Sequence, residues 1–271
     1  YQEPRGVQRI QGNPIDGPAG RVTAGMQALA TAMNERLPSG VVRLGHAVEG
    51  IEAIEGGLRV HAVRREAADG ESVPTAMEAK AVIVTLPPAL AVHAITFEPE
   101  LPTSLVDLAA ATPVWMGAMT KVVIHYDRPF WREAGLAGAA ISHLGPLREI
   151  HDMSGPEGEP AALFGFAPPL RPGAPTPTTE AVVTQIGTLF GPAASDPNAL
   201  FVLDWRTQTY TTPPDVDRLQ NYATFGHPLY RTPTLEGRLH WASTETATEV
   251  PGHIEGALAA GARAAAAVLA G

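Results

Sequence analysis

The C-terminal part of the sequence holds the strongest candidate for chemistry. A short strand that we expect to be buried, residues 238–242, leads into a polar stretch that includes Ser243, Thr244 and Glu245, and a helix is predicted over residues 252–269. The free N–H groups at the start of such a helix attract negative charge. The helix is rich in alanine and glycine, so its backbone could approach a neighbour or a ligand closely. The pattern indicates either a ligand-binding turn or a tightly packed terminal helix.

A second candidate is Lys121, which stands inside a long apolar run at residues 114–126. A lysine in a strand of this kind needs a polar partner or a lowered pKa. The sequence has one other lysine, Lys80, and arginine supplies the remaining positive side chains. Lys121 is therefore either a functional cation, a member of a structural ion pair, or a solvated strand end.

The composition excludes several classes of site. Cysteine is absent, which removes disulfides, thiolate catalysis and cofactors attached through a thioether. The histidines show no metal-ligand spacing and no Gly-x-Ser-x-Gly segment occurs, so we expect neither a metal site nor a serine hydrolase. With 19 basic and 28 acidic residues the formal net charge is −9, so we expect no nucleic-acid partner.

No apolar run reaches the length of roughly 18 residues that a membrane span requires. We therefore expect no membrane span and a soluble, cytoplasmic protein. The first residue is Tyr1, which is typical of a processed or trimmed chain.

Hydrophobic periodicity predicts a mixed α and β fold with a sizeable antiparallel sheet. The predicted helices cover residues 22–37, 179–190 and 252–269, and the predicted strands cover residues 41–44, 48–54, 58–63, 79–86, 114–126, 139–143, 161–167, 201–206 and 238–242. We expect a hairpin with its turn at Gly56 and Gly57, a long polar turn over residues 64–78, and a surface turn at His151 and Asp152.

The C-terminal stretch resembles the flavin-binding signature of the flavin-containing amine oxidases, the family of monoamine, polyamine and L-amino-acid oxidases. The family pattern G-R-[IL]-x-[FW]-A-G-T-E-T-A matches residues 237–247 at all but one position, and the following G-[YH]-[MI]-[ED]-G-A matches residues 252–257. Further matches occur in the family order at Gln8-Arg9, residues 81–90, Phe97-Glu98-Pro99, residues 120–123 and Pro129-Phe130-Trp131. The resemblance spans nearly the whole chain.

This resemblance implies an α+β or α/β fold: an antiparallel-sheet substrate domain plus the returning strands and C-terminal helix of an FAD-binding domain of glutathione-reductase type. It assigns residues 1–90 to the entry loop, helix and hairpin of the FAD domain, residues 91–205 to the substrate domain, and residues 206–271 to the return into the FAD domain. The G-x-G-x-x-G turn that opens family members does not occur in this sequence. The match is therefore to the C-terminal part of the family sequence.

The resemblance also implies roles for individual residues. FAD would be bound by Val48, Ser243, Thr244, Glu245, Gly252, His253 and Ile254. Lys121 would hold a water near flavin N5, and His253 and Tyr210 would supply the two rings that flank the substrate nitrogen. Ser243, His253 and Ile254 replace the family's usual glycine, tyrosine and methionine. Tyr210 is alternatively a partly exposed loop tyrosine.

The implied function is FAD-dependent oxidation of a small-molecule amine or amino acid to an imine, with dioxygen reduced to hydrogen peroxide. Because the sequence has no cysteine for a covalent link, we expect noncovalent FAD. Activity would need a glycine-rich FAD-binding portion, which a separate fragment or chain could supply. The alternative is a catalytically silent substrate-domain module that acts in binding or assembly.

Overall fold

The computed structural model describes residues 22–65, 72–114, 116–169, 173–214 and 222–271, together with the backbone of residues 2–3 and 6–7. The chain divides into two units, Tyr1–Leu44 and Gly45–Gly271. This division does not test the domain boundaries expected from the sequence, which stay a prediction.

The first unit contains one helix and a short antiparallel pair. Strand β1 (Gln2–Glu3) pairs with β2 (Gly6–Val7), and helix α1 covers Gln27–Glu35. The predicted helix over 22–37 is thus confirmed in its centre but is shorter, because Gly25 takes a positive φ of 75° before it and Pro38 follows it. No residue of α1 is buried. The predicted strand over 41–44 is wrong, since these residues form bends and turns.

The second unit begins with a four-stranded sheet in the order β5-β4-β3-β7. Its strands are β3 (His46–Ile54), β4 (Gly57–Arg65), β5 (Ser72–Ala79) and β7 (Thr96–Glu98). The predicted hairpin is confirmed, and its turn uses a positive φ of 79° at Gly56. The predicted long turn over 64–78 is wrong in its second half, because β5 pairs antiparallel with β4 along its whole length. Its polar residues and Pro74 suit an exposed edge strand.

A two-stranded parallel sheet joins segments far apart in the sequence: β6 (Val82–Val84) and β13 (Leu239–Trp241). Helices α2 (Pro88–Ala94) and α3 (Thr103–Ala111) follow β6 in the chain and were not predicted. Both begin directly after a proline, Pro87 and Pro102. A proline costs little at the start of a helix, because the N–H that it lacks would have no partner within the helix. They pack with the two sheets around a core that contains Leu58, Leu105 and Trp241.

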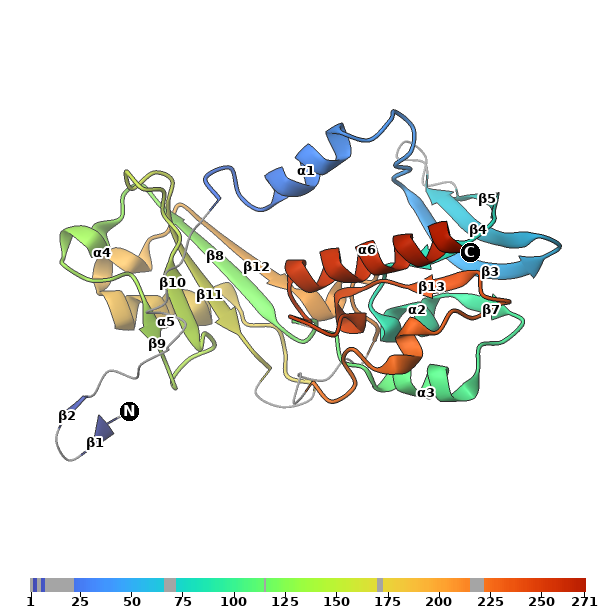
Figure 1. Cartoon of the computed structure of the whole chain (residues 1–271). Coiled ribbons are helices and arrows are strands. Elements are labelled where there is room, and N and C mark those ends of the chain that lie inside the picture. The colour runs from blue at the N-terminus through green and yellow to red at the C-terminus, as the bar shows by residue number, and fades with distance from the viewer. Residues whose placement is uncertain are drawn as a thin grey trace. The chain divides into compact units, whose positions relative to one another are not determined.

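The third sheet of this unit has five strands and is antiparallel throughout, in the order β12-β8-β11-β10-β9 (Figure 1). Its strands are β8 (Thr120–Tyr126), β9 (Ala140–Ile141), β10 (Glu149–Asp152), β11 (Ala161–Ala167) and β12 (Ala199–Asp204). The single antiparallel sheet is as predicted. The surface turn predicted at His151 and Asp152 is wrong, because both residues belong to β10. The strand predicted from residue 114 starts at Thr120, after a turn in which Met116 has a φ of 60°.

One face of this sheet is covered by helix α5 (Thr179–Phe190), whose Val182 and Ile186 are fully buried against it. The sequence offers Thr178 or Thr179 as the N-cap of this helix, and Thr178 takes that role, because its hydroxyl accepts the Ala181 N–H at 3.2 Å. Short helices complete this unit: α4 (Phe130–Glu133) and the 3₁₀ turns η1 (Pro192–Ser195), η2 (Trp205–Thr207), η3 (Pro228–Arg231) and η4 (Thr244–Thr246).

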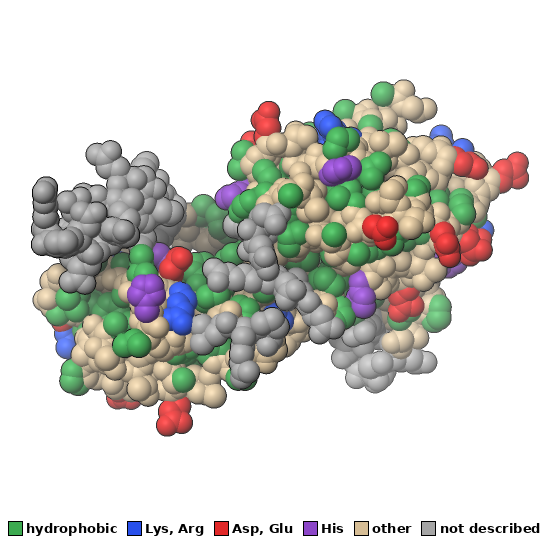
Figure 2. All heavy atoms as spheres, turned by 90° about the horizontal axis from the view of Figure 1, so that it is seen from below, with side chains coloured by type: hydrophobic (Ala, Val, Ile, Leu, Met, Phe, Trp, Pro, Cys, Tyr) green, Lys and Arg blue, Asp and Glu red, His purple; other side chains and the backbone are tan. Residues whose placement is uncertain are grey.

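Helix α6 (Ile254–Ala270) ends the chain and lies alongside β13 (Figure 1). Ala260 and Ala264 are its most deeply buried side chains, and their small size allows this close packing. Among the described residues, no helix combines the length and the apolar character that a membrane span requires. Figure 2 shows side chains of both charge signs scattered, with hydrophobic ones between them, over the face that it presents.

Candidate functional site

The signature segment folds as strand, turn and helix. The β13 strand is fully buried, and its pairing with β6 is continued by the Ala242 N–H, which donates to the Val84 carbonyl at 2.8 Å. The chain then turns at Ser243 into η4 and enters α6 after a loop at residues 247–253. The predicted order of a strand, a polar turn and a helix is therefore confirmed, with helix α6 starting at Ile254.

Three side-chain hydrogen bonds between this segment and α6 or its N-cap residue fix the turn. Thr244 Oγ1 donates to the His253 carbonyl at 2.8 Å, which ties η4 to the start of α6. Arg263 Nη2 donates to the Trp241 carbonyl at 2.8 Å and to Thr246 Oγ1 at 3.2 Å. Burial, and to a smaller extent the charge of Arg231, lowers the pKa of Arg263. The turn is held by its own helix and by the strand before it.

The contact between the turn and the helix depends on Gly256. A Cβ at this position would overlap the Val250 carbonyl oxygen and would lie 3.0 Å from Thr244 Oγ1. The second glycine of the family pattern G-x-x-x-G-A therefore has a packing reason here: position 256 of α6 has no room for a side chain.

A pocket of about 380 Å³ lies at this turn. Its lining joins Ser243, Thr244 and Glu245 of the turn to the exposed face of α6 and to the end of β6: Thr85, Pro87, Ala242, Ile254, Ala257, Leu258 and Gly261. Ser243 is 4% exposed and its hydroxyl has no hydrogen-bond partner among the described residues. A buried, unsatisfied hydroxyl at a pocket wall favours a ligand with hydrogen-bonding atoms.

A larger pocket of about 630 Å³ lies between the four-stranded sheet and the β6 strand. Val48 lines it together with His46, Leu90 and Tyr210. Thr85 lines both pockets, so the two pockets approach each other at the end of β6. Sequence reasoning missed Thr85 and helix α2 as lining elements, although residues 81–90 belong to the family pattern.

Lys121 lies in the five-stranded sheet, on the face opposite α5. Its neighbours across the strands are Phe166 on β11 and Leu203 on β12. The Lys121 ammonium lies 5.1 Å from the centre of the Trp205 ring, and burial lowers the pKa of Lys121. Sequence reasoning missed Trp205, because nothing in the spacing of residues 121 and 205 indicates that strands β8 and β12 are neighbours.

The side chains on this face of the sheet, which we call the open face, are half-buried or exposed and mainly apolar. They are Ile141, Glu149, His151, Phe164, Phe166, Lys121, Val123, His125, Phe201 and Leu203. The Phe164 and Phe166 rings pack edge to face at 4.8 Å, and the His125 and Phe201 rings at 6.0 Å. The open face thus combines aromatic and aliphatic side chains with one lysine, one glutamate and two histidines.

The structure brings the predicted site residues together in groups. Ser243, Thr244, Glu245 and Ile254 share the smaller pocket, and Val48 and Tyr210 share the larger one. Gly252, His253 and Lys121 line neither of these two pockets, and His253 and Tyr210 do not lie together in either of them. Tyr210 is 56% exposed. The described residues contain no group of three or more His, Asp or Glu side chains arranged to hold a metal.

The family model of flavin containing amine oxidoreductases matches residues 5–269. The chain belongs to this family. It is 35% identical over 257 residues to AofH of Mycobacterium tuberculosis, which is named as a flavin-containing monoamine oxidase, with 88% of this chain and 53% of AofH covered. It is 30% identical over 261 residues to putrescine oxidase of Kocuria rosea, with 92% of this chain and 52% of that protein covered.

The fold is likewise similar to solved amine oxidases. A putrescine oxidase bound to putrescine superimposes with a TM-score of 0.74 at 27% identity, covering 92% of this chain and 53% of that one. Cyclohexylamine oxidase from Brevibacterium oxydans gives a TM-score of 0.64 at 31% identity, covering 82% of this chain and 47% of that one. The chain thus spans about half the length of the relatives that it matches.

Proposed function

We propose that this chain supplies the C-terminal part of a noncovalent FAD site in an enzyme that oxidises small amines. The observation that carries the proposal is the smaller pocket, which the family's flavin signature builds from Ser243, η4 and the exposed face of α6. The family is flavin-containing, but the identity of the flavin and its noncovalent attachment are part of our proposal.

The residues around this pocket fit a phosphate-bearing cofactor. The N-terminus of α6 directs free N–H groups and a positive dipole end outward. The Ser243 hydroxyl, buried and without a partner among the described residues, could donate to a phosphate or ribityl oxygen. Gly252 and His253 at the end of the loop and Ile254 at the start of α6 would lie along the same group.

Glu245 contributes to this site through a hydrogen bond of its backbone carbonyl, and not through the charge of its side chain. Its side chain is 2% exposed, and a buried carboxylate repels a phosphate. Its carbonyl accepts the Gly226 N–H at 2.8 Å, which ties the turn to the segment around Gly226. We therefore assign Glu245 to shaping the turn, and Val48 in the larger pocket to the adenine end of the cofactor.

The open face of the sheet would form the substrate wall. A bound flavin would supply the two-electron oxidation of the amine to an imine, and dioxygen would be reduced to hydrogen peroxide. The open-face side chains include three phenylalanines and no arginine, which favours an amine over a substrate that needs a carboxylate partner. They would orient the substrate and exclude water. Lys121 would hold a water on the flavin side, and the paired-ring role of Tyr210 and His253 stays a prediction.

The test uses the two lysines as a matched pair. In flavin-loaded protein, Lys121→Met should slow reoxidation of reduced flavin by dioxygen by roughly a hundredfold, the order expected when one placed donor is removed. Lys80 is exposed, so Lys80→Met serves as the control and should leave the rate unchanged. Equal reoxidation rates in the two variants and the parent would show that Lys121 takes no part in the reaction of reduced flavin with dioxygen.

A further inference from the structure

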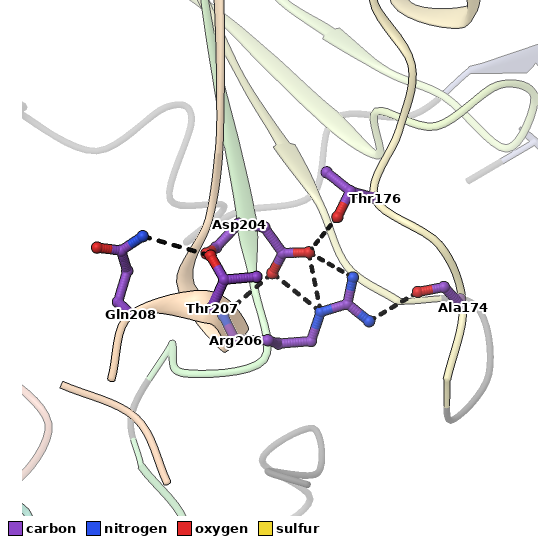
Figure 3. A network of polar contacts seen from close by, with 6 residues as sticks. All are labelled: Ala174, Thr176, Asp204, Arg206, Thr207 and Gln208. Atoms are coloured by element: carbon purple, nitrogen blue, oxygen red, sulfur yellow. Dashed lines mark hydrogen bonds and ion pairs between the residues drawn. The ribbon is translucent and has the colours of Figure 1, made fainter. Parts of the chain in front are cut away.

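A partly buried ion pair, Asp204 and Arg206, lies at the end of strand β12. The Asp204 side chain is 6% exposed and accepts from Arg206 Nε at 2.9 Å and Arg206 Nη2 at 2.5 Å, while Thr176 Oγ1 donates to it at 2.5 Å (Figure 3). Arg206 Nη1 also donates to the Ala174 carbonyl at 2.7 Å. Burial raises the pKa of Asp204, but the hydrogen bonds from Arg206 and Thr176 outweigh this effect. The pKa of Asp204 is therefore below its ordinary value, and the carboxylate stays ionised.

The same two residues fold the backbone between them into the tight turn η2. The Arg206 N–H donates to Asp204 Oδ1 at 3.0 Å, and Thr207 Oγ1 donates to the Asp204 carbonyl at 2.8 Å. Trp205 lies between Asp204 and Arg206, and its own N–H donates to the Met119 carbonyl at 3.2 Å. The backbone on both sides of Trp205 is therefore fixed, which limits the positions open to its ring.

The Trp205 ring lies against the Lys121 ammonium, at 5.1 Å from centre to nitrogen. Lys121 forms no ion pair with any residue that the structure describes. The other titratable groups on the open face are His125, further along the same strand, and Glu149 and His151 on β10, with the β11 strand in between. The charge of Lys121 is thus stabilised by a cation–π contact with the ring of Trp205.

We propose that Arg206 and Asp204 are positioning residues that hold the Trp205 ring against Lys121 and thereby orient the lysine's N–H donors. An aromatic face attracts the cation but is a poor acceptor for several N–H groups. With the ring fixed on one side of the ammonium, the N–H donors point into the space in front of the open face, where a water or a ligand atom can accept. The value of this orientation for catalysis rests on the proposed function, but the positioning itself does not.

The test measures the position of the ring without any flavin. Reductive ¹³C-methylation labels the amino groups, and with Lys80 replaced by Arg the chain retains one labelled lysine, Lys121, beside the N-terminal amine. Protons that lie over an aromatic face resonate upfield, so the Lys121 methyl signal should be shifted upfield in this protein. Trp205→Leu should abolish the shift, and Arg206→Ala should remove most of it.

A matched control is the pair Arg132 and Asp152, which is also attached to the five-stranded sheet and has a 2.6 Å contact. Arg132→Ala should leave the Lys121 signal unchanged. If Arg206→Ala does not fold, Thr176→Val removes a single hydrogen bond from Asp204 and should give a smaller change in the same direction. An unaltered Lys121 signal in a folded Arg206→Ala or Thr176→Val protein overturns the proposal, and it would do so whether or not the chain binds flavin.

Discussion

The Asp152 carboxylate illustrates how single residues stabilise the sheet that carries Lys121. Arg132 Nε donates to it at 2.6 Å and the Ser154 N–H donates at 2.8 Å. Burial raises the pKa of Asp152, but hydrogen bonds from Arg132 and Ser154 outweigh it and lower the pKa to about 2. The ionised form therefore stabilises the fold, and we expect this contribution in full above the ordinary carboxylate pKa.

The first prediction concerns this residue. Because its folded pKa lies below the unfolded value, the stabilisation should be lost as the pH falls from about 4 to about 2. Asp152→Asn should lower the free energy of unfolding by about 1–2 kcal/mol at pH 7 and by much less near pH 2.5. Urea unfolding at both pH values measures the difference. Asp196→Asn, at an exposed carboxylate, is the control, and an equal loss at both pH values for Asp152→Asn would contradict the assignment.

At the scale of elements, helix α6 offers two glycines with opposite expectations. A Cβ at Gly256 would collide with the turn before the helix, whereas a Cβ at Gly261 would meet nothing within 4 Å. Gly256→Ala should therefore destabilise the protein by about 1–3 kcal/mol. Gly261→Ala should stabilise it by up to about 1 kcal/mol, the difference in helix propensity. Thermal unfolding of both variants checks this, and equal effects would show that α6 is not packed against η4.

The elements that sequence patterns predicted well are those whose partners are near in sequence or whose pattern is long. The hairpin of β3 and β4 and helix α5 are examples. Strand β5 was missed because its exposed, polar residues resemble a turn until the neighbouring strand β4 is known. Helices α2 and α3 were missed because prolines lie at their starts: Pro87 and Pro88 indicate the end of the preceding strand, and Pro102 directly precedes α3.

The candidate site divides in the same way. The turn from Ser243 to Ile254 is continuous in sequence, so its order of strand, turn and helix could be predicted from the signature. The contact of Lys121 with Trp205 could not, because it depends on the pairing of β8 with β12, whose strands lie far apart in the chain. The role of the Asp204 and Arg206 pair depends on the same pairing.

At the scale of the whole molecule, the parallel sheet of β6 and β13 has only two strands among the described residues. Parallel strands are normally covered and paired on both sides, and the G-x-G-x-x-G strand of dinucleotide-binding domains supplies such pairing together with phosphate-binding N–H groups. With a net charge of −9, this chain alone should hold a pyrophosphate weakly. We therefore expect a segment that carries the glycine-rich turn to raise both its flavin affinity and its solubility.

The most direct test of the account is the visible spectrum of this chain produced together with such a segment. We expect a yellow protein with one FAD per chain, and acid precipitation should release all of the flavin into the supernatant because no cysteine is present to attach it. The chain alone should be colourless after desalting. A complemented protein that remains colourless, or that keeps its colour in the acid pellet, would contradict the proposal of a noncovalent FAD site at Ser243 and helix α6.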